Sequence, residues 1–405
     1  MTRPKIAIVN VFFPPQAIGG ATRVVADNVS VLERDYSDEF DLVYYTSDVG
    51  STPAHQVNVY TLNGRRAYRA GALHRVNMDW HPFDPESGVQ FGRFLDHEKP
   101  DLVHFHCIQR LTASVVEQTA ARNIPYVVTL HDAWWISDFQ FLVDPSGKVY
   151  PEGHPDPYVV TPLPTGVTRE ESMQRRMRLR SLLNTSARVL TVSEAFADIH
   201  RKNDFPDVEV TLNGVDSDPW LPKVPSPAGR VRLAHIGGME HHKGYYLLRD
   251  VLKSGSFANV ELTVVDHARP YGYSRTEKWG STRVTVVGKI PQADIADLYA
   301  RTDVLLAPST WPESFGLVTR EAAAAGCWVV TSDIGAIGEQ VQDGVTGIIV
   351  KANNRPSLRD AVAAIDADSE RYLAAPPPSD LQTPEDQVEQ LVGIYRDVLG
   401  TSTTA

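Results

Sequence analysis

The sequence lacks the features of several protein classes. It has only two cysteines in 405 residues, Cys107 and Cys327, too few for a disulfide framework or for a zinc site built from several cysteines. No run of about 18 uninterrupted apolar residues is present, and the first residues do not show the basic, apolar and small-residue pattern of a secretory signal. We therefore expect a cytoplasmic protein.

Positive charge is also in deficit. Lysine and arginine number 39 against 50 aspartates and glutamates, a net charge of −11, which argues against non-specific binding to nucleic acid. Arginines nevertheless gather in residues 65–75 and 169–180. These segments could contact anionic lipid headgroups at the inner face of a membrane, although a solvated helix face explains them equally well.

The length and the hydrophobic pattern predict two α/β domains. A chain of this length is typical of two or three domains at roughly 150 residues each. Short apolar runs alternate with helical patterns, which is typical of doubly wound parallel sheets. The runs lie at residues 5–11, 101–106, 126–130, 188–192 and 208–212, and again at 231–236, 260–265, 284–287, 304–306, 328–331 and 347–350.

The domain boundaries follow from composition. We expect an N-terminal domain over residues 1–216, a proline-rich linker over 217–230 and a second domain over 231–380. Residues 381–405 are expected to include a helix that could return to the first domain. Residues 138–166, rich in proline and without periodicity, are either a functional insertion or a mobile segment.

A glycine pair, Gly19 and Gly20, stands between the first predicted strand and helix. Ligands bind at this edge of such sheets, and glycine lets a phosphate approach the backbone amides at a helix N-terminus. Plain turn geometry explains the pair almost equally well.

The second domain has a comparable loop with Gly237, Gly238 and Lys243 after its first strand. A lysine at a helix start, close to glycines and the positive end of the helix dipole, suits a diphosphate. The spacing does not fit a Walker A loop, and a solvated lysine at a helix cap is the alternative. His241 and His242 are adjacent and point in different directions, so a shared metal site there is disfavoured.

The strongest signal is the segment from residue 308 to residue 326, where two glutamates, Glu313 and Glu321, lie eight residues apart around Gly316. On a continuous helix they would be about 12 Å apart at 1.5 Å per residue, farther than the roughly 5 to 9.5 Å between paired glycosidase carboxylates. Backbone amides near Gly316 suit phosphate oxygens instead, and Glu321 could accept hydrogen bonds from ribose hydroxyls.

These motifs resemble the retaining glycosyltransferases of family GT4, which have the GT-B fold of two Rossmann-like, doubly wound domains facing a central cleft. Glu313 and Glu321 match the family's E-x7-E motif, and Lys243 with Gly244 matches its diphosphate-binding lysine and glycine. Residues 213–216 and 343–347 fit further family patterns. One departure is Gly238, which stands where many members have an arginine.

The resemblance implies transfer of a sugar from a UDP- or GDP-sugar to an acceptor hydroxyl with retention, in polysaccharide, O-antigen or glycoconjugate synthesis. The acceptor would be a sugar or a lipid-linked molecule bound by the N-terminal domain, and the nucleotide sugar would be bound by the second domain. No metal or other cofactor is expected. Catalytic roles fall to His131, at the end of a strand and near the reacting carbon, and to Glu313 and Lys243. The residues expected to bind the donor are Gly19, Gly20, Gly237, Gly238, Lys243, Ser314, Phe315, Gly316, Leu317, Val318 and Glu321.

Other readings stay open at this point. A hydrolase or epimerase of nucleotide sugars would share the nucleotide site, and the change at Gly238 also allows a non-catalytic nucleotide-sugar-binding protein. His104 and His106 share one strand face, but no third and fourth ligand with zinc spacing is evident, which disfavours a metal site.

Overall fold

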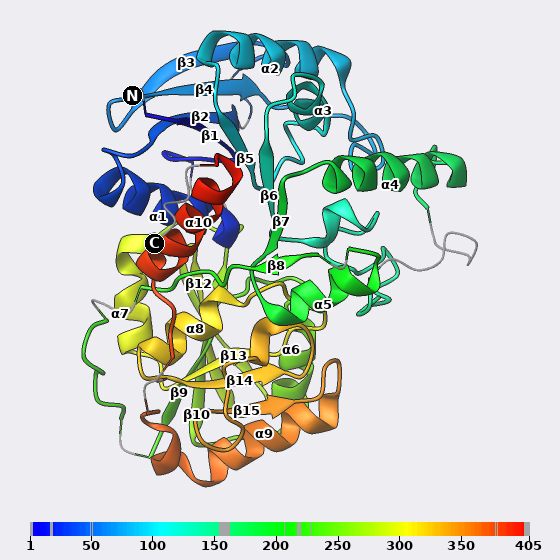
Figure 1. Cartoon of the computed structure of the whole chain (residues 1–405). Coiled ribbons are helices and arrows are strands. Elements are labelled where there is room, and N and C mark those ends of the chain that lie inside the picture. The colour runs from blue at the N-terminus through cyan, green and yellow to red at the C-terminus, as the bar shows by residue number, and fades with distance from the viewer. Residues whose placement is uncertain are drawn as a thin grey trace. The chain divides into compact units, whose positions relative to one another are not determined.

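A computed structural model describes residues 3–16, 19–48, 50, 52–153, 163–205, 207–216, 220–227, 229–376, 378 and 380–400. These residues divide into two compact units, each built around its own sheet (Figure 1). The first unit comprises Met1–Leu142, Glu152–Gly214 and Pro384–Ala405, and the second comprises Val143–Pro151 and Val215–Thr383.

The first unit has an eight-stranded sheet in the order β3-β4-β2-β1-β5-β6-β7-β8. All neighbours are parallel except β3 and β4, which form an antiparallel pair. The strands are β1 Lys5–Val9, β2 Asp41–Asp48, β3 Val57–Leu62, β4 Arg65–Gly71, β5 Leu102–Phe105, β6 Tyr126–Leu130, β7 Arg188–Thr191 and β8 Glu209–Val210. The helices are α1 Gly19–Asp35, α2 Pro85–Glu98, α3 Ser114–Ala121, α4 Arg169–Asn184, α5 Glu194–Lys202 and α10 Pro384–Val398, with a short 3-10 turn η1 Ala133–Trp135.

The second unit has a seven-stranded sheet in the order β11-β12-β10-β9-β13-β14-β15, with only β11 antiparallel to its neighbour among the described strands. The strands are β9 Val231–His235, β10 Val260–Asp266, β11 Ser274–Trp279, β12 Thr282–Gly288, β13 Val304–Ala307, β14 Trp328–Ser332 and β15 Gly347–Val350. The helices are α6 Tyr245–Ser254, α7 Ile295–Ala300, α8 Leu317–Ala324 and α9 Arg355–Ala367, with short turns η2 Gln292–Asp294, η3 Ala336–Gly338 and η4 Ser369–Tyr372.

Both sheets run outward in two directions from their first strand, β1 or β9, so each is doubly wound as predicted. In such sheets the carboxyl ends of the strands on either side of the reversal form the ligand-binding edge. The loops after β1, β9 and β13 therefore begin where sites are expected, and the loop after β6 begins at the same edge of the first sheet, two strands from β1.

Four strands were not predicted from the sequence: β3 and β11, which are edge strands, and β2 and β4, which lie inside the first sheet. In β3 most side chains are exposed or half-buried, and β11 carries Arg275, Glu277 and Lys278 among its six residues. Charged and exposed side chains on an edge strand discourage pairing with other chains, and they also remove the continuous apolar run by which a buried strand is recognised.

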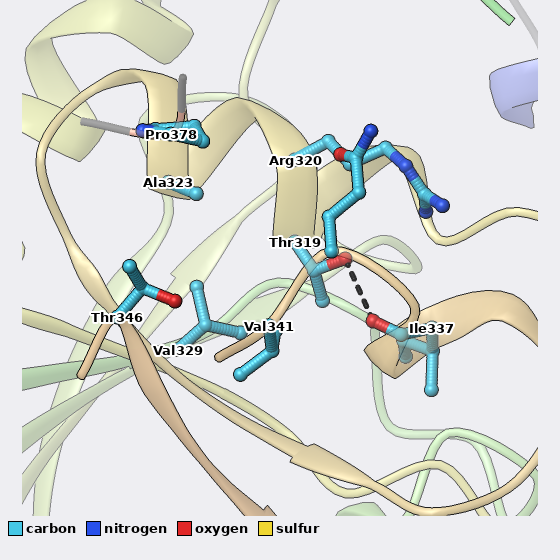
Figure 2. Close-up of a pocket in the computed structure, with 9 residues that line it drawn as sticks. Thr319, Arg320, Ala323, Val329, Ile337, Val341, Thr346 and Pro378 are labelled. Carbon is cyan, nitrogen blue, oxygen red and sulfur yellow. Dashed lines mark hydrogen bonds between the residues drawn. The ribbon is translucent and has the colours of Figure 1, made fainter. Parts of the chain in front are cut away.

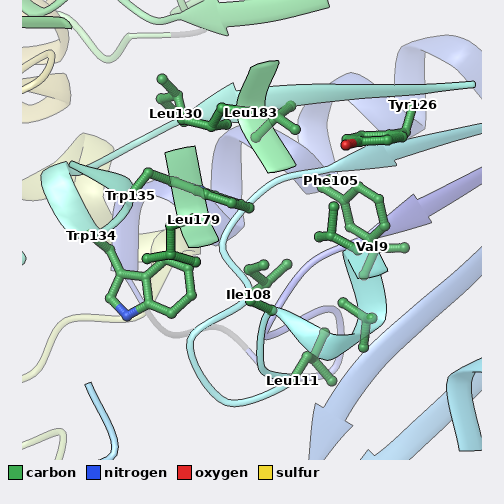
Figure 3. Packing of buried hydrophobic residues seen from close by; sticks show 14 of the residues in the cluster. Val9, Phe105, Ile108, Leu111, Tyr126, Leu130, Trp134, Trp135, Leu179 and Leu183 are labelled. Atoms are coloured by element: carbon green, nitrogen blue, oxygen red, sulfur yellow. The ribbon is translucent and has the colours of Figure 1, made fainter. Parts of the chain in front are cut away.

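The core of the first unit lies on both faces of its sheet. One cluster includes Val9, Phe105 and Tyr126 from the strands, together with Trp134 and Leu179, as Figure 3 shows. A second cluster packs Val388, Leu391, Val392 and Tyr395 of α10 against strand residues such as Ile6 and Leu102. Helix α10 is therefore part of the first unit, although it follows the second unit in the chain.

The proline-rich segment before the second sheet is bonded to that unit. Lys223 Nζ donates to the carbonyl oxygens of Tyr299, at 3.1 Å, and Thr302. Ser226 Oγ donates to an Asp303 carboxylate oxygen at 2.5 Å. The described residues 220–227 therefore pack on the second unit, in a stretch predicted as a linker, while residues 217–219 and 228 lie outside the described residues.

Two other segments considered in the sequence analysis also lie partly outside the described residues. Of the proline-rich stretch 138–166, residues 154–162 lie outside the described residues, as do residues 401–405. Among the helices that the structure describes, none is both long enough and apolar enough to cross a membrane.

Candidate active site

The first part of the site is the loop between β9 and α6. Strand β9 ends at His235, whose ring is held between the carbonyl oxygens of Leu306, at 2.9 Å, and Gly238, at 3.0 Å. Burial lowers the pKa of His235. The neutral ring has a single N–H, so it donates to one of these two carbonyl oxygens at a time. It fixes the position of Gly237 and Gly238 at the carboxyl end of the strand.

A side chain at Gly238 would meet His267, the residue after β10. The backbone of Gly238 is left-handed, at φ +77°, and an added Cβ would lie 2.9 Å from His267 Cδ2. His267 Nε2 donates to the Ile236 carbonyl at 2.9 Å, which holds the ring against the loop. An imidazole therefore borders the position where the family resemblance led us to note a missing arginine.

Helix α6 begins with a close backbone approach that only glycine allows. Gly244 has φ +78°, and a Cβ there would lie 1.9 Å from the carbonyl oxygen of Pro308, which follows β13. The backbone N–H of Thr310 donates to the His242 carbonyl at 2.9 Å. The loops after β9 and β13 are thus joined, and this brings Lys243 next to the glutamate segment.

Lys243 and Glu313 form an ion pair. Lys243 Nζ lies 3.0 Å from Glu313 Oε2, with 27% of the lysine side chain and 8% of the glutamate side chain exposed. The other carboxylate oxygen of Glu313 accepts a hydrogen bond from Ser309 Oγ. Lys243 Nζ also lies 5.4 Å from the ring centroid of Trp311, a cation–π distance. Because the ammonium has three donors, one contact to Glu313 leaves donors for a ligand.

Helix α8 starts directly after this pair. Gly316 precedes it with φ +79°, and a Cβ there would lie 2.9 Å from Ile337 Cγ1 and 3.0 Å from Ile337 Cα. Since glycine has no side chain with which to cap the helix, the first amides, those of Leu317 and Val318, are the groups that an anion would meet. Ser314 and Phe315 lie in the turn between Glu313 and this start.

Glu321 is one turn further along α8 and is buried, at 2% exposure. Tyr299, from the end of α7, donates its hydroxyl to Glu321 Oε2 at 3.0 Å. A buried carboxylate needs such partners, and Tyr299 fixes one of the two oxygens of Glu321. Tyr299 and Ser309 were not identified from the sequence, since nothing in the local pattern signals which side chain will reach a glutamate 22 or 4 residues away.

Arg320, also missed, holds the loops around α8 together. Its guanidinium donates to the Phe315 carbonyl, lies 3.8 Å from the Phe315 ring centroid and is 3.3 Å from a Glu339 carboxylate oxygen. Only 3% of Arg320 is exposed, and burial lowers its pKa to about 10. Arg320 therefore remains charged at pH 7 and ties the turn before α8 to the segment after η3.

A small pocket lies beside α8, lined by Thr319, Arg320 and Ala323 of the helix and by Val329, Ile337, Gln340, Val341, Thr346 and Pro378. In Figure 2, Thr319 Oγ1 donates to the Ile337 carbonyl, at 3.2 Å, across one side of it. Its volume of about 10 Å³ holds about one water molecule and no nucleotide. Neither Glu313 nor Lys243 lines it, so it is separate from the ion pair.

His131 belongs to the first unit, directly after β6, and only 9% of it is exposed. Its Nε2 lies 3.1 Å from Nδ1 of His106, the residue after β5. The neighbouring His104 is bonded to Tyr395 of α10 at 2.6 Å and to Thr129 at 2.7 Å. Burial lowers the pKa of His131 to about 4, so the ring is neutral at pH 7.

The next residue, Asp132, is shaped by the same burial. Its carboxylate accepts from the backbone N–H of Trp134 at 2.9 Å and from the amide groups of Gln109 and Gln140. Burial nevertheless raises its pKa to about 6. Among the described residues, no cluster of three or more histidine, cysteine, aspartate or glutamate side chains is arranged to hold a metal.

Gly19 and Gly20 are the first residues of α1, and Gly19 has φ +80°. Both are exposed. The structure thus gathers Gly237, Gly238, Lys243, Glu313, Ser314, Phe315, Gly316, Leu317, Val318 and Glu321 within the second unit. His131, Gly19 and Gly20 belong to the first unit.

The arginines of the segment 65–75 are largely engaged within the chain. In the first segment, Arg65 pairs with Asp41 at 2.7 Å and Arg66 with the buried Glu98 at 3.2 Å. The guanidinium of Arg69 lies 4.4 Å from the Tyr60 ring centroid.

Two family models match the chain. Residues 18–219 match the model described as Glycosyltransferase Family 4, and residues 216–375 match that of Glycosyl transferases group 1. Together the models extend from α1 to η4 and so include the site and every described strand of both sheets except β1, which precedes them.

Curated relatives match over part of their length. A glycogen synthase of Mycobacterium tuberculosis is 30% identical over 172 residues, which is 39% of this chain and 40% of that protein. A phosphatidyl-myo-inositol mannosyltransferase of Mycobacterium leprae is 34% identical over 174 residues, 40% of this chain and 46% of that protein. The alignments thus span less than half of these relatives. A D-inositol 3-phosphate glycosyltransferase of Corynebacterium kroppenstedtii is 26% identical over 65% of this chain and 64% of that protein.

Solved structures agree over nearly the whole chain. Sucrose-phosphate synthase of Thermosynechococcus elongatus superposes with a TM-score of 0.73 at 19% identity, covering 99% of this chain and 100% of that one. HepE of Anabaena superposes with a TM-score of 0.62 at 17% identity, covering 98% of each chain. At these identities the likeness establishes the fold, and the family models establish the family. The chain belongs to family 4 of the glycosyltransferases and has the GT-B fold.

Proposed function

We propose that this protein is a glycosyltransferase that moves a sugar from a nucleoside diphosphate sugar to an acceptor hydroxyl with retention at the anomeric carbon. The observation that carries the proposal is the Lys243–Glu313 ion pair immediately before the glycine-started helix α8. This arrangement offers positive charge, backbone amides and a buried carboxylate within one short stretch of the second unit.

The diphosphate would be bound by the positive elements of this arrangement. Lys243 supplies a charge-assisted donor, and the amides of Leu317 and Val318 add the positive end of the α8 dipole. Gly237 and Gly238 leave two positions of the loop after β9 without side chains, beside Lys243. His267, held against Gly238, is the histidine that we propose supplements Lys243 at the diphosphate.

The sugar and the ribose would be bound by the carboxylates. Glu313 is partly neutralised by Lys243 and is suited to accept from hydroxyls of the transferred sugar. Glu321, with one oxygen held by Tyr299, is suited to accept from ribose hydroxyls. Ser314, Phe315 and Gly316 complete the turn on which these groups stand.

The chemistry needs negative charge to be stabilised on the departing diphosphate, and preorganised donors in the site supply this without a metal in the proposed mechanism. No covalent nucleophile is proposed; the leaving phosphate oxygen takes the acceptor proton as the acceptor oxygen bonds to the anomeric carbon on the same face. His131 keeps the role implied by the resemblance, a contact to the transferred sugar. Because its pKa is about 4, it would act as a neutral hydrogen-bonding group at pH 7 and not as a general acid.

Named neighbours support a nucleotide-sugar donor. HepE has been solved with UDP-glucose, and starch synthase IV of Arabidopsis thaliana, a structural neighbour at 14% identity, with ADP and acarbose. The relatives named as glycogen synthase and as inositol-directed transferases suggest sugar or lipid-linked acceptors, in polysaccharide, O-antigen or glycoconjugate synthesis. We propose UDP- or GDP-sugars as donors and a cytoplasmic site of action.

The test is to incubate the protein, treated with EDTA, with UDP-glucose, UDP-galactose or GDP-mannose and a panel of sugar acceptors. Proton NMR would identify both the product and its anomeric configuration. Formation of an α-linked product from one of these α-linked donors supports the proposal. Release of free sugar or an isomerised donor in every reaction, with no glycoside formed, would show a hydrolase or an epimerase instead.

A further inference from the structure

The first unit contains a groove to which the proposed function assigns no role. It is lined by the segment Trp80–Phe83 and by residues of helix α4, the helix labelled in Figure 1. The volume of the groove is about 200 Å³, and its residues are Trp80, His81, Pro82, Phe83, Glu171, Gln174, Arg175 and Arg178. The four residues from α4 are spaced three and four apart, so they share one helix face.

The helix side of this groove is firmly built. Only 2% of Arg175 is exposed, and its guanidinium donates to the carbonyl oxygens of Asp79 and, at 2.6 Å, Trp134. The start of α4 is fixed by a capping box, in which the Thr168 side chain and Glu171 bond to each other's backbone amides at 3.2 and 2.8 Å. The groove is therefore a preformed feature and not a gap between loosely held side chains.

Its lining combines apolar rings with planar polar groups. Trp80 and Phe83 provide aromatic surface, and the Arg178 guanidinium lies over the Phe83 ring, 3.5 Å from its centroid. Glu171, Gln174 and His81 add acceptors and donors around the rings. A sugar ring presents the same combination, with C–H groups on its faces and hydroxyls at its edge.

The charges in the groove are compensated. Arg175 lies 3.4 Å from a carboxylate oxygen of the buried Asp138, and Arg178 lies 2.6 Å from Glu117. The carboxylate of Glu171 lines the same groove and opposes the positive charge of the arginines. A phosphate or an anionic lipid headgroup would need uncompensated positive charge, which these pairs do not leave, so a neutral polyhydroxy ligand fits better.

We infer that this groove binds one neutral saccharide unit of the acceptor. Its volume lies below the roughly 300 to 1,000 Å³ of pockets for drug-sized ligands, which suits a single ring better than a nucleotide. That the saccharide is part of the acceptor rests on the proposed function. The binding of a saccharide can nevertheless be tested without any transfer reaction.

The test is saturation-transfer NMR on the full chain with methyl α-glucoside, methyl α-galactoside, methyl α-mannoside, N-acetylglucosamine and myo-inositol, with inositol 1-phosphate as the charged probe. Gln174→Ala and Arg178→Ala alter exposed positions in the groove. Arg180→Ala is the matched control, because Arg180 is on the same helix and pairs with Asp204 at 2.9 Å but does not line the groove. Circular dichroism establishes that each variant is folded.

We expect at least one neutral sugar to bind wild type and Arg180→Ala equally and to bind Gln174→Ala and Arg178→Ala at least tenfold more weakly. Binding of none of the sugars, or binding that Gln174→Ala and Arg178→Ala leave unchanged, overturns the inference. Tighter binding of inositol 1-phosphate than of myo-inositol also overturns the inference, in favour of an anion site. Binding of vesicles with 30% phosphatidylserine that is lost in Arg178→Ala overturns it in favour of a membrane site. A parallel titration of wild type with UDP and GDP separates this outcome from failure of the proposed function.

Discussion

Replacing Lys243 by methionine tests the diphosphate role of the ion pair. Methionine keeps the apolar stem of the side chain but cannot donate, so the charge-assisted hydrogen bond to a phosphate oxygen is lost. Such a bond contributes about 1.5 to 3 kcal/mol, and at 1.4 kcal/mol per tenfold the affinity for a nucleoside diphosphate should fall by roughly 10- to 140-fold. The nucleoside monophosphate should lose less, because it lacks the terminal phosphate.

The assay is isothermal titration calorimetry with UDP, GDP and ADP and with the corresponding monophosphates. Glu313 keeps its hydrogen bond from Ser309 in this variant, so we expect the fold to be retained. Lys253→Met, an exposed lysine in the last turn of α6, is the matched control and should bind as wild type does. Binding of diphosphates to Lys243→Met within twofold of wild type would refute the assignment.

Three further predictions concern the surroundings of the site. Tyr299→Phe removes a donor to the buried carboxylate of Glu321, so nucleotide affinity by calorimetry should fall about tenfold for a loss near 1.4 kcal/mol; unchanged affinity would contradict the positioning role. Gly244→Ala should lower the free energy of unfolding in urea by more than about 2 kcal/mol, because of the left-handed backbone and the contact with Pro308; a smaller loss would show that the loops can move apart. Burial lowers the pKa of His104 to about 3 and of His131 to about 4, so unfolding takes up protons from about pH 6.5 downward, and stability should fall as the pH drops towards 4; a urea midpoint equal at pH 7 and pH 5 would contradict this.

The Gly244→Ala prediction has a matched control, and the predicted pH dependence includes one opposing contribution. Gly393→Ala, within helix α10, places a Cβ where no atom lies within 4 Å, and it should stabilise the protein by about 0.5 to 1 kcal/mol. For the pH dependence, Asp132 acts in the opposite direction, because burial raises its pKa to about 6 and the folded protein then binds the extra proton. Burial also lowers the pKa values of His106 and His200, so the buried histidines outweigh this one carboxylate and stability falls in acid.

The sequence predicted the fold through its buried strands. Strands β5, β6, β13 and β14 are buried along their whole length, and their continuous apolar runs mark a parallel sheet. Edge strands such as β3 and β11 carry no such signal, because Asn58 and Thr61 interrupt the apolar residues of β3 and because charged side chains interrupt β11. The position of α10 in the first unit depends on contacts between segments that are far apart in the chain, such as the His104–Tyr395 hydrogen bond.

The motif residues of the candidate site were likewise readable, because their spacing around Gly316 is itself the signal. The side chains that contact these motif residues could not be predicted from the sequence. Ser309, Tyr299 and Arg320 are set by how β13, α7 and α8 pack, and composition does not distinguish a buried arginine from a solvated one. Arg175 makes the same point: within an arginine-rich helix it is almost completely buried and bonded to backbone carbonyls.

The central claim is that the second unit binds a nucleoside diphosphate through Glu321 and its neighbours. Calorimetric titration of wild type and Glu321→Ala with UDP, GDP and ADP in EDTA tests it most directly. We predict that wild type binds at least one of the three and that Glu321→Ala, with an unchanged circular dichroism spectrum, binds it at least tenfold more weakly. No binding to wild type, or equal binding to both proteins, would contradict the account.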